Sequence, residues 1–294
     1  MYRALHDAVR DAESQGKSLA RLALETEARD QGRPIEEIRA ALRRALQVMR
    51  GAVAQGLTGE LKSASGLVGG DAAKLRTGPP GPLAGTPFRD ILARALAVQE
   101  VNAAMGVIVA APTAGGAGVL PAVLTGLADA RGIDEEGLVD ALATAGLIGA
   151  VVAERASLSG AEGGCQAETG AAAAMAAGAG TEMLGGTPTQ VGHAVALAQQ
   201  GTLGLVCDPL GGLVELPCVF RNATGAAIAL AGIEMALAGI TFAIPADEVI
   251  DTMGEIGRSM DVRYRETAGG GLAATPTGRR LARERLVQIK KSGG

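Results

Sequence analysis

The sequence predicts an all-α fold: a compact, Ala/Gly-rich helical domain with its cysteines on irregular loops. The 294 residues include 44 Gly but no Trp, two Tyr and three Phe, so close backbone packing must replace large side chains in the core. Alanine is the best intrinsic helix former, and small residues let helices approach at short interaxial distances. Apolar residues recur at helical spacing in several stretches, and none alternates as in a strand.

The first 55 residues form the N-terminal helical segment of this prediction. From Ile35 to Val53 apolar residues recur at spacings of three and four, with charged residues on the other faces. Pro34 suits the first position of a helix and Gly56 suits its end. We therefore expect an amphipathic helix between these two residues.

The next segment contains a loop, a linker and three helices. The stretch "LKSASGLVGGDAAKL" is typical of a loop that enters a helix, and "TGPPGPLAGTP" of a Pro/Gly linker within one domain. Helices are predicted over 89–105 and 119–130. Asp134 is the expected N-cap of a third, which has Glu135 and Glu136 in the first turn, where the helix dipole favours negative charge.

The run from Val101 to Ala128 has no charged side chain and is long enough to cross a membrane. Pro112, Pro121 and the "TAGGAG" cluster interrupt it. We interpret it as two buried helices joined by a glycine-rich turn, and we expect no contact with a membrane.

Three more helices are predicted towards the C-terminus, over 189–200, 222–242 and 246–260. The last ordered feature is the stretch "RYRETAGGGLAATPTG", and a basic tail follows at 279–294. The whole chain, 1–294, is expected to be a single domain.

The charge pattern and the N-terminus exclude several classes of protein. The formal net charge is −4, and no basic block is interleaved with aromatic residues, so nucleic-acid binding is not expected. The N-terminus alternates charged and apolar residues without the apolar core of an export signal. We therefore expect a cytoplasmic protein.

The chain has three cysteines, Cys165, Cys207 and Cys218. Three cysteines cannot all pair, and their spacing is not that of a C-x2-C metal motif, so ordinary buried thiols are one interpretation. However, glycine or proline neighbours favour loops, where ligands gather. If the thiolates met at one four-iron cluster, one iron would stay open to act as a Lewis acid, and soft thiolates favour iron–sulfur or zinc.

Five stretches together carry a specific family resemblance over residues 63–277: "SASGLVGGDAAKL", "EVNAAMGVIVAAPTAGGAGVLPAVL", "SGAEGGCQAETGAAAAMAAG", "GLVCDPLGGLVELPCVFRNA" and "RETAGGGLAATPTG". In these the chain resembles the alpha chain of the iron–sulfur-dependent L-serine dehydratases, lyases that convert L-serine to pyruvate and ammonia. The resemblance implies that Cys165, Cys207 and Cys218 each hold one iron of a [4Fe-4S] cluster. It places the cluster and the substrate within 56–278.

The resemblance also implies a beta chain as partner. The family's Gly-Pro-Ser-Ser-Ser-His-Thr motif, carried on its beta domain, is absent here, which leaves open whether a catalytic base comes from the other chain. The tail "VQIKKSGG" also lacks the C-terminal cysteine that single-chain relatives can bring to the cluster.

Polar residues and glycines within the family stretches are the predicted partners of the small amino-acid substrate. A glycine turn can bind an anion through consecutive N–H groups, although a plain connection between helices is the commoner role. His193 is the candidate base or hydrogen-bond donor, against the alternative of a packing residue. Glu162 and Glu168 flank Cys165 and are expected to be solvated unless they orient the ligand loop. The predicted substrate-binding residues are Ser63, Ser65, Asn102, Thr113, Gly115, Gly116, Arg221 and Asn222.

Three other readings compete. A pyridoxal-phosphate enzyme could catalyse the same reaction, but none of the five lysines has a suitable context for the Schiff base. A related iron–sulfur amino-acid lyase of the cysteine desulfidase type is the closest alternative. The third is a non-catalytic scaffold whose Ala/Gly helices pack through small residues.

Overall fold

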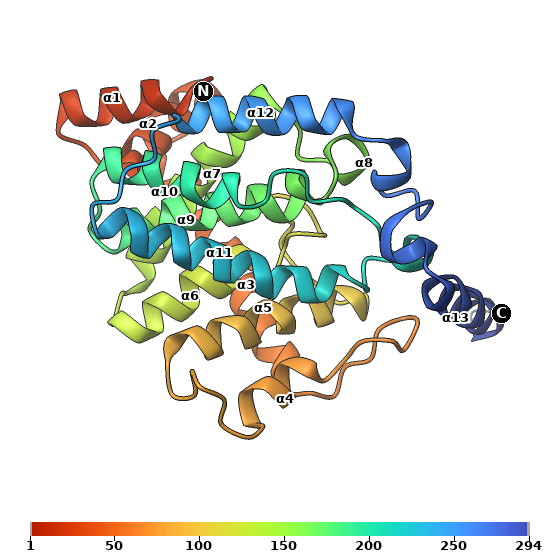
Figure 1. Ribbon diagram of the computed structural model, residues 1–294. Coiled ribbons are helices and arrows are strands. Elements are labelled where there is room, and N and C mark those ends of the chain that lie inside the picture. Colours follow the sequence, from red (N-terminus) through yellow and green to blue (C-terminus); the bar gives the residue numbers. More distant parts are fainter. Residues whose placement is uncertain (1, 293–294) are drawn as a thin grey trace.

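The computed structural model describes residues 2–292, and the side chains of 286–292 are not described. Over these residues every regular element is helical, and the only β feature is an isolated bridge between Cys207 and Arg265. The prediction of an all-α fold is confirmed (Figure 1). The α-helices are α1 (Leu5–Gln15), α2 (Leu19–Gln31), α3 (Ile35–Gly56), α4 (Asp71–Thr77), α5 (Pro87–Ala103), α6 (Val119–Arg131), α7 (Glu135–Arg155), α8 (Gly160–Gly163), α9 (Ala171–Met183), α10 (Pro188–Gln200), α11 (Cys218–Leu237), α12 (Ala246–Ser259) and α13 (Pro276–Ser292).

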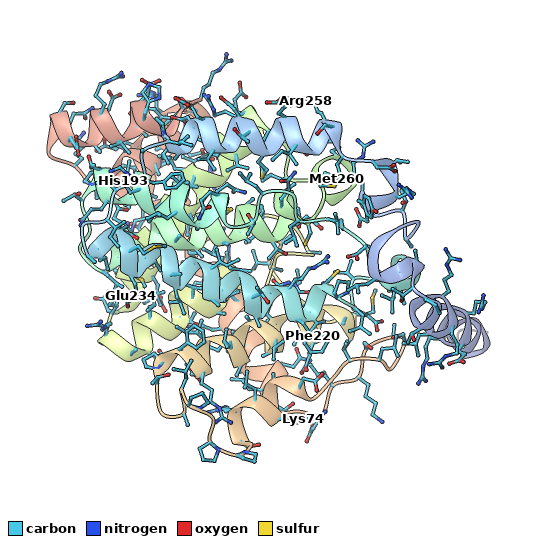
Figure 2. All side chains as sticks on the ribbon, viewed as in Figure 1. Lys74, His193, Phe220, Glu234, Arg258 and Met260 are labelled. Atoms are coloured by element: carbon cyan, nitrogen blue, oxygen red, sulfur yellow. The ribbon has the colours of Figure 1, made fainter. Side chains whose placement is uncertain are left out.

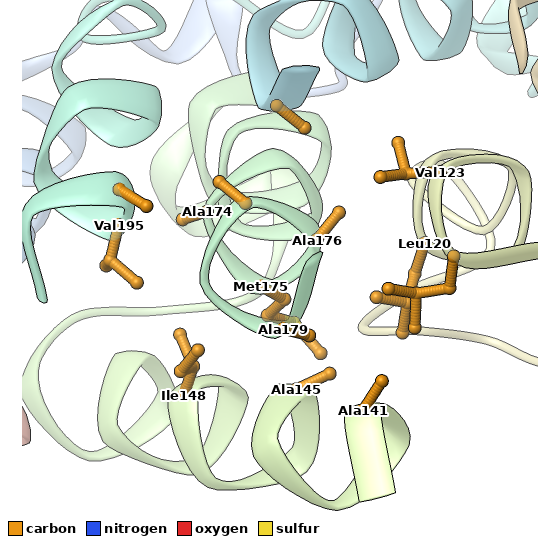
Figure 3. Packing of buried hydrophobic residues seen from close by; sticks show 14 of the residues in the cluster. Leu120, Val123, Ala141, Ala145, Ile148, Ala174, Met175, Ala176, Ala179 and Val195 are labelled. Carbon is orange, nitrogen blue, oxygen red and sulfur yellow. The ribbon is translucent and has the colours of Figure 1, made fainter. Parts of the chain in front are cut away.

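The Ala/Gly-rich helix α9 lies at the centre of the fold. It is buried on all sides over its first eleven residues and packs against α6, α7, α10 and α11. Figure 3 shows Ala174, Met175, Ala176 and Ala179 of α9 enclosed by side chains of α6, α7 and α10. A helix that is apolar all round is stable in such a place because no face needs to meet water.

Glycines allow this close packing. A Cβ atom at Gly180 would lie 2.5 Å from Cδ1 of Ile233, and one at Gly178 would collide with Cδ1 of Ile148. Any side chain at these positions would therefore push α11 or α7 away from α9. The expected replacement of large side chains by close backbone contact is confirmed here.

Helix starts predicted from the sequence are largely confirmed. Asp134 caps α7 by accepting a hydrogen bond from the N–H of Gly137, and Pro34 directly precedes α3. The start of α10 is a capping box, in which Thr187 and Gln190 satisfy each other's backbone N–H groups.

Three other helices are capped by carboxylates from distant parts of the chain. Asp247 of α12 accepts the N–H groups of Leu5 and His6 at 2.8 and 3.0 Å, at the start of α1. Glu182 of α9 does the same for the start of α2, and Glu100 of α5 for the start of α4. The first turns of α1, α2 and α4 are therefore tied to core helices, and α2 also has a local cap, because Ser18 accepts the N–H of Arg21.

The uncharged run from Val101 spans the end of α5, a glycine-rich connection and most of α6. The helix α5 ends at Ala103, and residues 104–118 are not helical, with Met105 85% and Val107 73% exposed. A side chain at Gly106 would lie 2.6 Å from Cγ1 of Val101, so the chain turns sharply there, and Pro112 follows. The prediction of two buried helices joined by a glycine-rich turn is therefore confirmed, except that the first helix ends at Ala103 rather than at Met105 and the connection is longer than a turn.

The ends of α11 differ from the predicted ones. The predicted helix over 222–242 starts earlier, at Cys218, and ends at Leu237, because Gly239 takes a left-handed φ of 83°.

Helix α7 is long and apolar enough to cross a membrane, but 67% of its most apolar stretch is buried inside the protein. We therefore interpret α7 as a core helix.

Candidate metal centre

The three cysteines lie where irregular segments meet helices. Cys165 lies between α8 and a π-helical turn, Gln166–Gly170, that leads into α9. Cys207 lies in a connecting segment and forms the isolated bridge with Arg265, whereas Cys218 is the first residue of α11. All three thiols are free and buried, with 3%, 2% and 5% of each residue exposed.

The electrostatics show that the three thiols are neighbours. Burial raises the pKa of Cys207, and Cys165, Glu168 and Cys218 raise it further. Burial also raises the pKa of Cys218 to about 12, with Cys165 and Glu168 again adding to the effect. These effects indicate that the thiols lie in one region of the fold, and their convergence on one cluster stays a prediction.

The arrangement suits a cluster rather than a single ion. Within residues 2–292, no three His, Cys, Asp or Glu side chains are close enough to share one metal ion. A zinc ion needs every thiolate sulfur within about 2.3 Å of the same point. In an iron–sulfur cluster each thiolate binds a different iron, so the sulfurs can be farther apart. Three soft, buried, neighbouring thiols fit the second requirement.

The π-helical turn after Cys165 organises one side of this centre. Such turns are rare and are often found at functional sites. The fully buried side chain of Gln166 accepts a hydrogen bond from Gly204 N–H and donates to the carbonyls of Gly163 and Met253. The turn is thereby fixed to the segment before Cys207 and to α12.

Glu168, on the same turn, points towards the thiols. Its Oε1 accepts a hydrogen bond from the hydroxyl of Thr113 at 2.7 Å, and its Oε2 lies 3.8 Å from Sγ of Cys207. Burial raises the pKa of this carboxyl; the Thr113 hydrogen bond opposes the shift, and nearby Glu266 adds to it. The glutamate that flanks Cys165 on the C-terminal side is thus not simply solvated, whereas Glu162 is exposed.

Three glycines make room for this carboxylate. A Cβ at Gly115 would lie 2.8 Å from both carboxylate oxygens of Glu168, and one at Gly160 would lie 2.6 Å from Oε2 and 3.1 Å from Sγ of Cys207. A Cβ at Gly116 would lie 2.8 Å from the backbone carbonyl oxygen of Glu168. None of the three has a left-handed φ, so clearance, not backbone conformation, requires glycine here.

Buried amides hold the loop at 112–118 in place. Asn222 donates to the carbonyls of Gly115 and Cys218 at 2.7 and 2.9 Å and accepts the N–H of Gly118 at 2.9 Å. Gln99 and Asn102 both donate to the carbonyl of Ala114. In the described part of the chain, the N–H groups of Gly115 and Gly116 donate to no protein acceptor. They therefore keep free hydrogen-bonding capacity beside Glu168.

Arg221 links the segments that carry Cys207 and Cys218. Its Nη1 donates to the carbonyl of Val206 and lies 2.8 Å from Oδ1 of Asp208. The segment around Cys207 is also bound to the C-terminal glycine-rich stretch, because Cys207 N–H donates to the carbonyl of Tyr264 and Cys207 accepts the N–H of Glu266. The Arg221 guanidinium also lowers the pKa of Cys165 and of Cys218, although burial raises both pKa values by more.

Ser63 and Ser65 support a neighbouring loop. Ser65 N–H donates to Oε1 of Glu215 at 3.0 Å, and the Ser65 hydroxyl donates to Oε2 of the same side chain. The Ser63 hydroxyl accepts the N–H of Val68. Because Glu215 lies three residues before Cys218, these serines are connected to the cysteine segment through it.

His193 is not brought together with the other predicted residues. Its Nδ1 accepts the N–H of Phe242 at 3.3 Å. Figure 2 shows His193 towards the Glu234 end of α11, whereas Phe220, two residues after Cys218, lies at the other end. The role of His193 as base or donor stays a prediction.

Sequence reasoning missed the structural roles of Gln99, Asp208 and Glu215, and it gave Glu168 only a conditional one. Asp208, Glu215 and Glu168 lie inside the family stretches, and Gln99 directly precedes one of them. Polar residues placed among glycines and alanines were the available signal. Nothing in their spacing indicated which groups they bind.

These features define a class: an all-helical protein with a buried centre of three thiols beside a glycine-enclosed carboxylate. Residues 14–273 match the serine dehydratase alpha chain family. The chain is 53% identical to the probable L-serine dehydratase alpha chain of Bacillus subtilis, over 81% of this chain and 80% of that one. It is 41% identical to the L-serine dehydratase alpha chain of Peptoniphilus asaccharolyticus, over 93% and 94% of the two chains.

The chain therefore belongs to the serine dehydratase alpha chain family. The predicted resemblance is confirmed. A further relative, the L-serine dehydratase of Streptomyces coelicolor, is 44% identical over 92% of this chain, which corresponds to 60% of its own length.

Proposed function

We propose that Cys165, Cys207 and Cys218 hold a [4Fe-4S] cluster and that the chain is the alpha subunit of an enzyme that converts L-serine to pyruvate and ammonia. The observation that supports the proposal is a set of three free, buried thiols that raise one another's pKa values. The names of the relatives from Bacillus subtilis and Peptoniphilus asaccharolyticus support the reaction.

The bound cluster would supply a Lewis acid that makes the β-hydroxyl of serine a better leaving group. The chain itself would orient the substrate. The free N–H groups of Gly115 and Gly116 are suited to the carboxylate of L-serine, because adjacent amides of a turn can bind an anion. Thr113 lies on the same loop, with its hydroxyl directed to Glu168.

The other predicted substrate-binding residues would act by positioning. The polar groups of Asn222 hold the loop at 112–118 and the start of α11, and Asn102 binds the same loop. Ser65 is engaged with Glu215, and Arg221 holds the segment that carries Cys207. We propose that these residues, with Ser63, shape the site within 56–278 and keep water away from it.

A beta chain is the proposed partner. Relatives that match over most of their length are named alpha chains, whereas this chain matches only 60% of the Streptomyces coelicolor L-serine dehydratase and 40% of the one named TdcG in Escherichia coli. A second chain would correspond to the rest of those longer proteins and could supply the base. We expect the complex in the cytoplasm.

Anaerobic reconstitution with iron and sulfide, alone and with a candidate beta chain, tests this proposal. We expect about four irons and four sulfides per chain, a broad visible absorption, and pyruvate from L-serine once the beta chain is present. A chain that takes up no iron would refute the cluster. Faster turnover of L-cysteine than of L-serine would favour the desulfidase-type alternative.

A further inference from the structure

L-Serine carries three recognisable groups: a hydroxyl, a carboxylate and an α-ammonium. The proposed function, on which this inference rests, accounts for the first two. A buried ammonium needs a fixed anionic partner, because an unpaired charge in a poorly solvated site is costly. The question is which side chain near the thiols can provide one.

Five carboxylates lie near the cysteine segments, and four are unsuitable. Glu215 already accepts the N–H and the hydroxyl of Ser65. Asp208 is already paired with Arg221 and accepts the N–H of Leu272. Glu162 and Glu266 are exposed, and Glu162 accepts a hydrogen bond from Ser157. Glu168 is half-buried, and its Oε2 has only the weak thiol contact with Cys207 at 3.8 Å. It therefore keeps an acceptor oxygen for a ligand.

The surroundings of Glu168 hold its carboxylate in one position. Gly160 and Gly115 lie so close to the carboxylate that even a methyl group would collide with it. Thr113 fixes the other oxygen by a 2.7 Å hydrogen bond, which orients the carboxylate plane. Glycines on two sides and one directional contact are what a preorganised acceptor requires.

The charge balance also favours a cation. Oε2 of Glu168 lies 3.8 Å from Sγ of Cys207, and Arg221 is already paired with Asp208. Cluster loading requires the thiols to be thiolates, which adds negative charge. A positive group beside Glu168 would relieve this repulsion.

We propose that Glu168 is the group that binds the α-ammonium of the amino-acid substrate. The free amides of Gly115 and Gly116 on the adjacent loop would bind the carboxylate of the same molecule. The positive and negative groups of the zwitterion would then be recognised by two segments that are joined through the Thr113–Glu168 hydrogen bond. The site would then select amino acids over hydroxy acids of the same shape.

Equilibrium dialysis of the reconstituted complex tests this role with two unreactive ligands. L-Alanine has the ammonium and carboxylate, whereas 3-hydroxypropanoate has the hydroxyl and carboxylate but no ammonium. Glu168→Gln should weaken L-alanine binding about 10- to 100-fold, which is typical of a lost hydrogen bond to a charged group. It should leave 3-hydroxypropanoate binding within about twofold. Glu168→Asp should recover part of the L-alanine affinity.

Glu162→Gln is the matched control, because Glu162 also flanks Cys165 but is exposed. It should bind both ligands as the wild type does. Iron and sulfide per chain are measured in every variant. An equal loss of both ligands, unchanged L-alanine binding, or loss of iron in Glu168→Gln would each overturn the ammonium role. If the wild type took up no iron, the proposed function would fail first, and this proposal with it.

Discussion

The carboxylate of Asp208 accepts the backbone N–H of Leu272 at 2.6 Å, although 64 residues separate them. Its other oxygen lies 2.8 Å from Nη1 of Arg221. One buried side chain thus joins the segment after Cys207, the start of α11 and the C-terminal glycine-rich stretch. The approach is so close that a Cβ at Gly271 would collide with Oδ2 of Asp208 and lie 2.6 Å from its Cβ.

Gly271→Ala should therefore destabilise the protein and reduce iron uptake. Gly271 has a left-handed φ of 55°, and an alanine there would carry both backbone strain and a clash with Asp208. Gly132→Ala separates the two effects, because Gly132 has a φ of 67° with nothing within 4 Å. Urea unfolding should show a loss of about 1 kcal/mol for Gly132→Ala and a clearly larger loss for Gly271→Ala. Equal losses would contradict the role of the close contact.

Replacing any one thiol should abolish cluster loading. Cys207→Ser removes a soft ligand from a site where each thiolate is expected to bind its own iron, so iron per chain should fall strongly and pyruvate formation should be lost. Thr224→Ser, on the exposed side of α11, is the control and should load normally. Full iron content in Cys207→Ser would remove this residue from the ligand set.

Gly160→Ala should impair the site without unfolding the protein. The added methyl group would lie 2.6 Å from Oε2 of Glu168 and 3.1 Å from Sγ of Cys207, so both groups would have to move. Turnover of L-serine should fall at least about tenfold, corresponding to about 1.4 kcal/mol. Gly146→Ala in α7, which meets nothing within 4 Å, should keep full activity and gain up to about 1 kcal/mol of stability. Unchanged turnover in Gly160→Ala would show that the clearance around Glu168 is not needed.

Asp247→Asn should weaken the attachment of α1. Burial alone would raise the pKa of Asp247, but the N–H groups of His6 and Leu5, the His6 ring and Arg155 together hold it below the ordinary value of 3.8. Loss of the charge should cost about 1–3 kcal/mol at neutral pH. Asp251→Asn, an exposed partner of Arg155 on the same helix, should cost less than about 1 kcal/mol.

The pH dependence of the unfolding free energy is a second test of the Asp247 cap. Because folding lowers the pKa of Asp247, its contribution is complete well above pH 3.8 and disappears as the pH falls through the lower folded value. The difference in unfolding free energy between the wild type and Asp247→Asn should thus be constant near neutrality and shrink below about pH 4. A difference that grows on acidification would contradict the cap.

The sequence allowed the helices to be predicted because their signals are local: Asp134 at the start of α7 and the periodicity of α3. The cysteines and the glycine loop could be singled out for the same reason. The contacts that assemble the site are not local. Glu168 meets Thr113 across 55 residues, and Asn222 meets Gly118 across 104. Spacing carries no information on such pairs.

The connection between α5 and α6 shows the same limit. Its glycines mark it as a loop, but the side chains of α5 and α11 that hold it, Gln99 and Asn222, lie outside the loop. His193 illustrates the opposite limit, because its residue type suits catalysis while its Nδ1 accepts the backbone N–H of Phe242.

The π-helical turn between Cys165 and α9 determines the direction, about the axis of α9, in which the Cys165 side chain points. Each of its residues closes a wider ring than an α-helix allows, so the turn holds one residue more than regular winding would. Deleting a single alanine or glycine there would restore ordinary winding and rotate everything before it by about 100° about the helix axis. A one-residue change in chain length, with no ligand altered, would aim the first sulfur away from the other two.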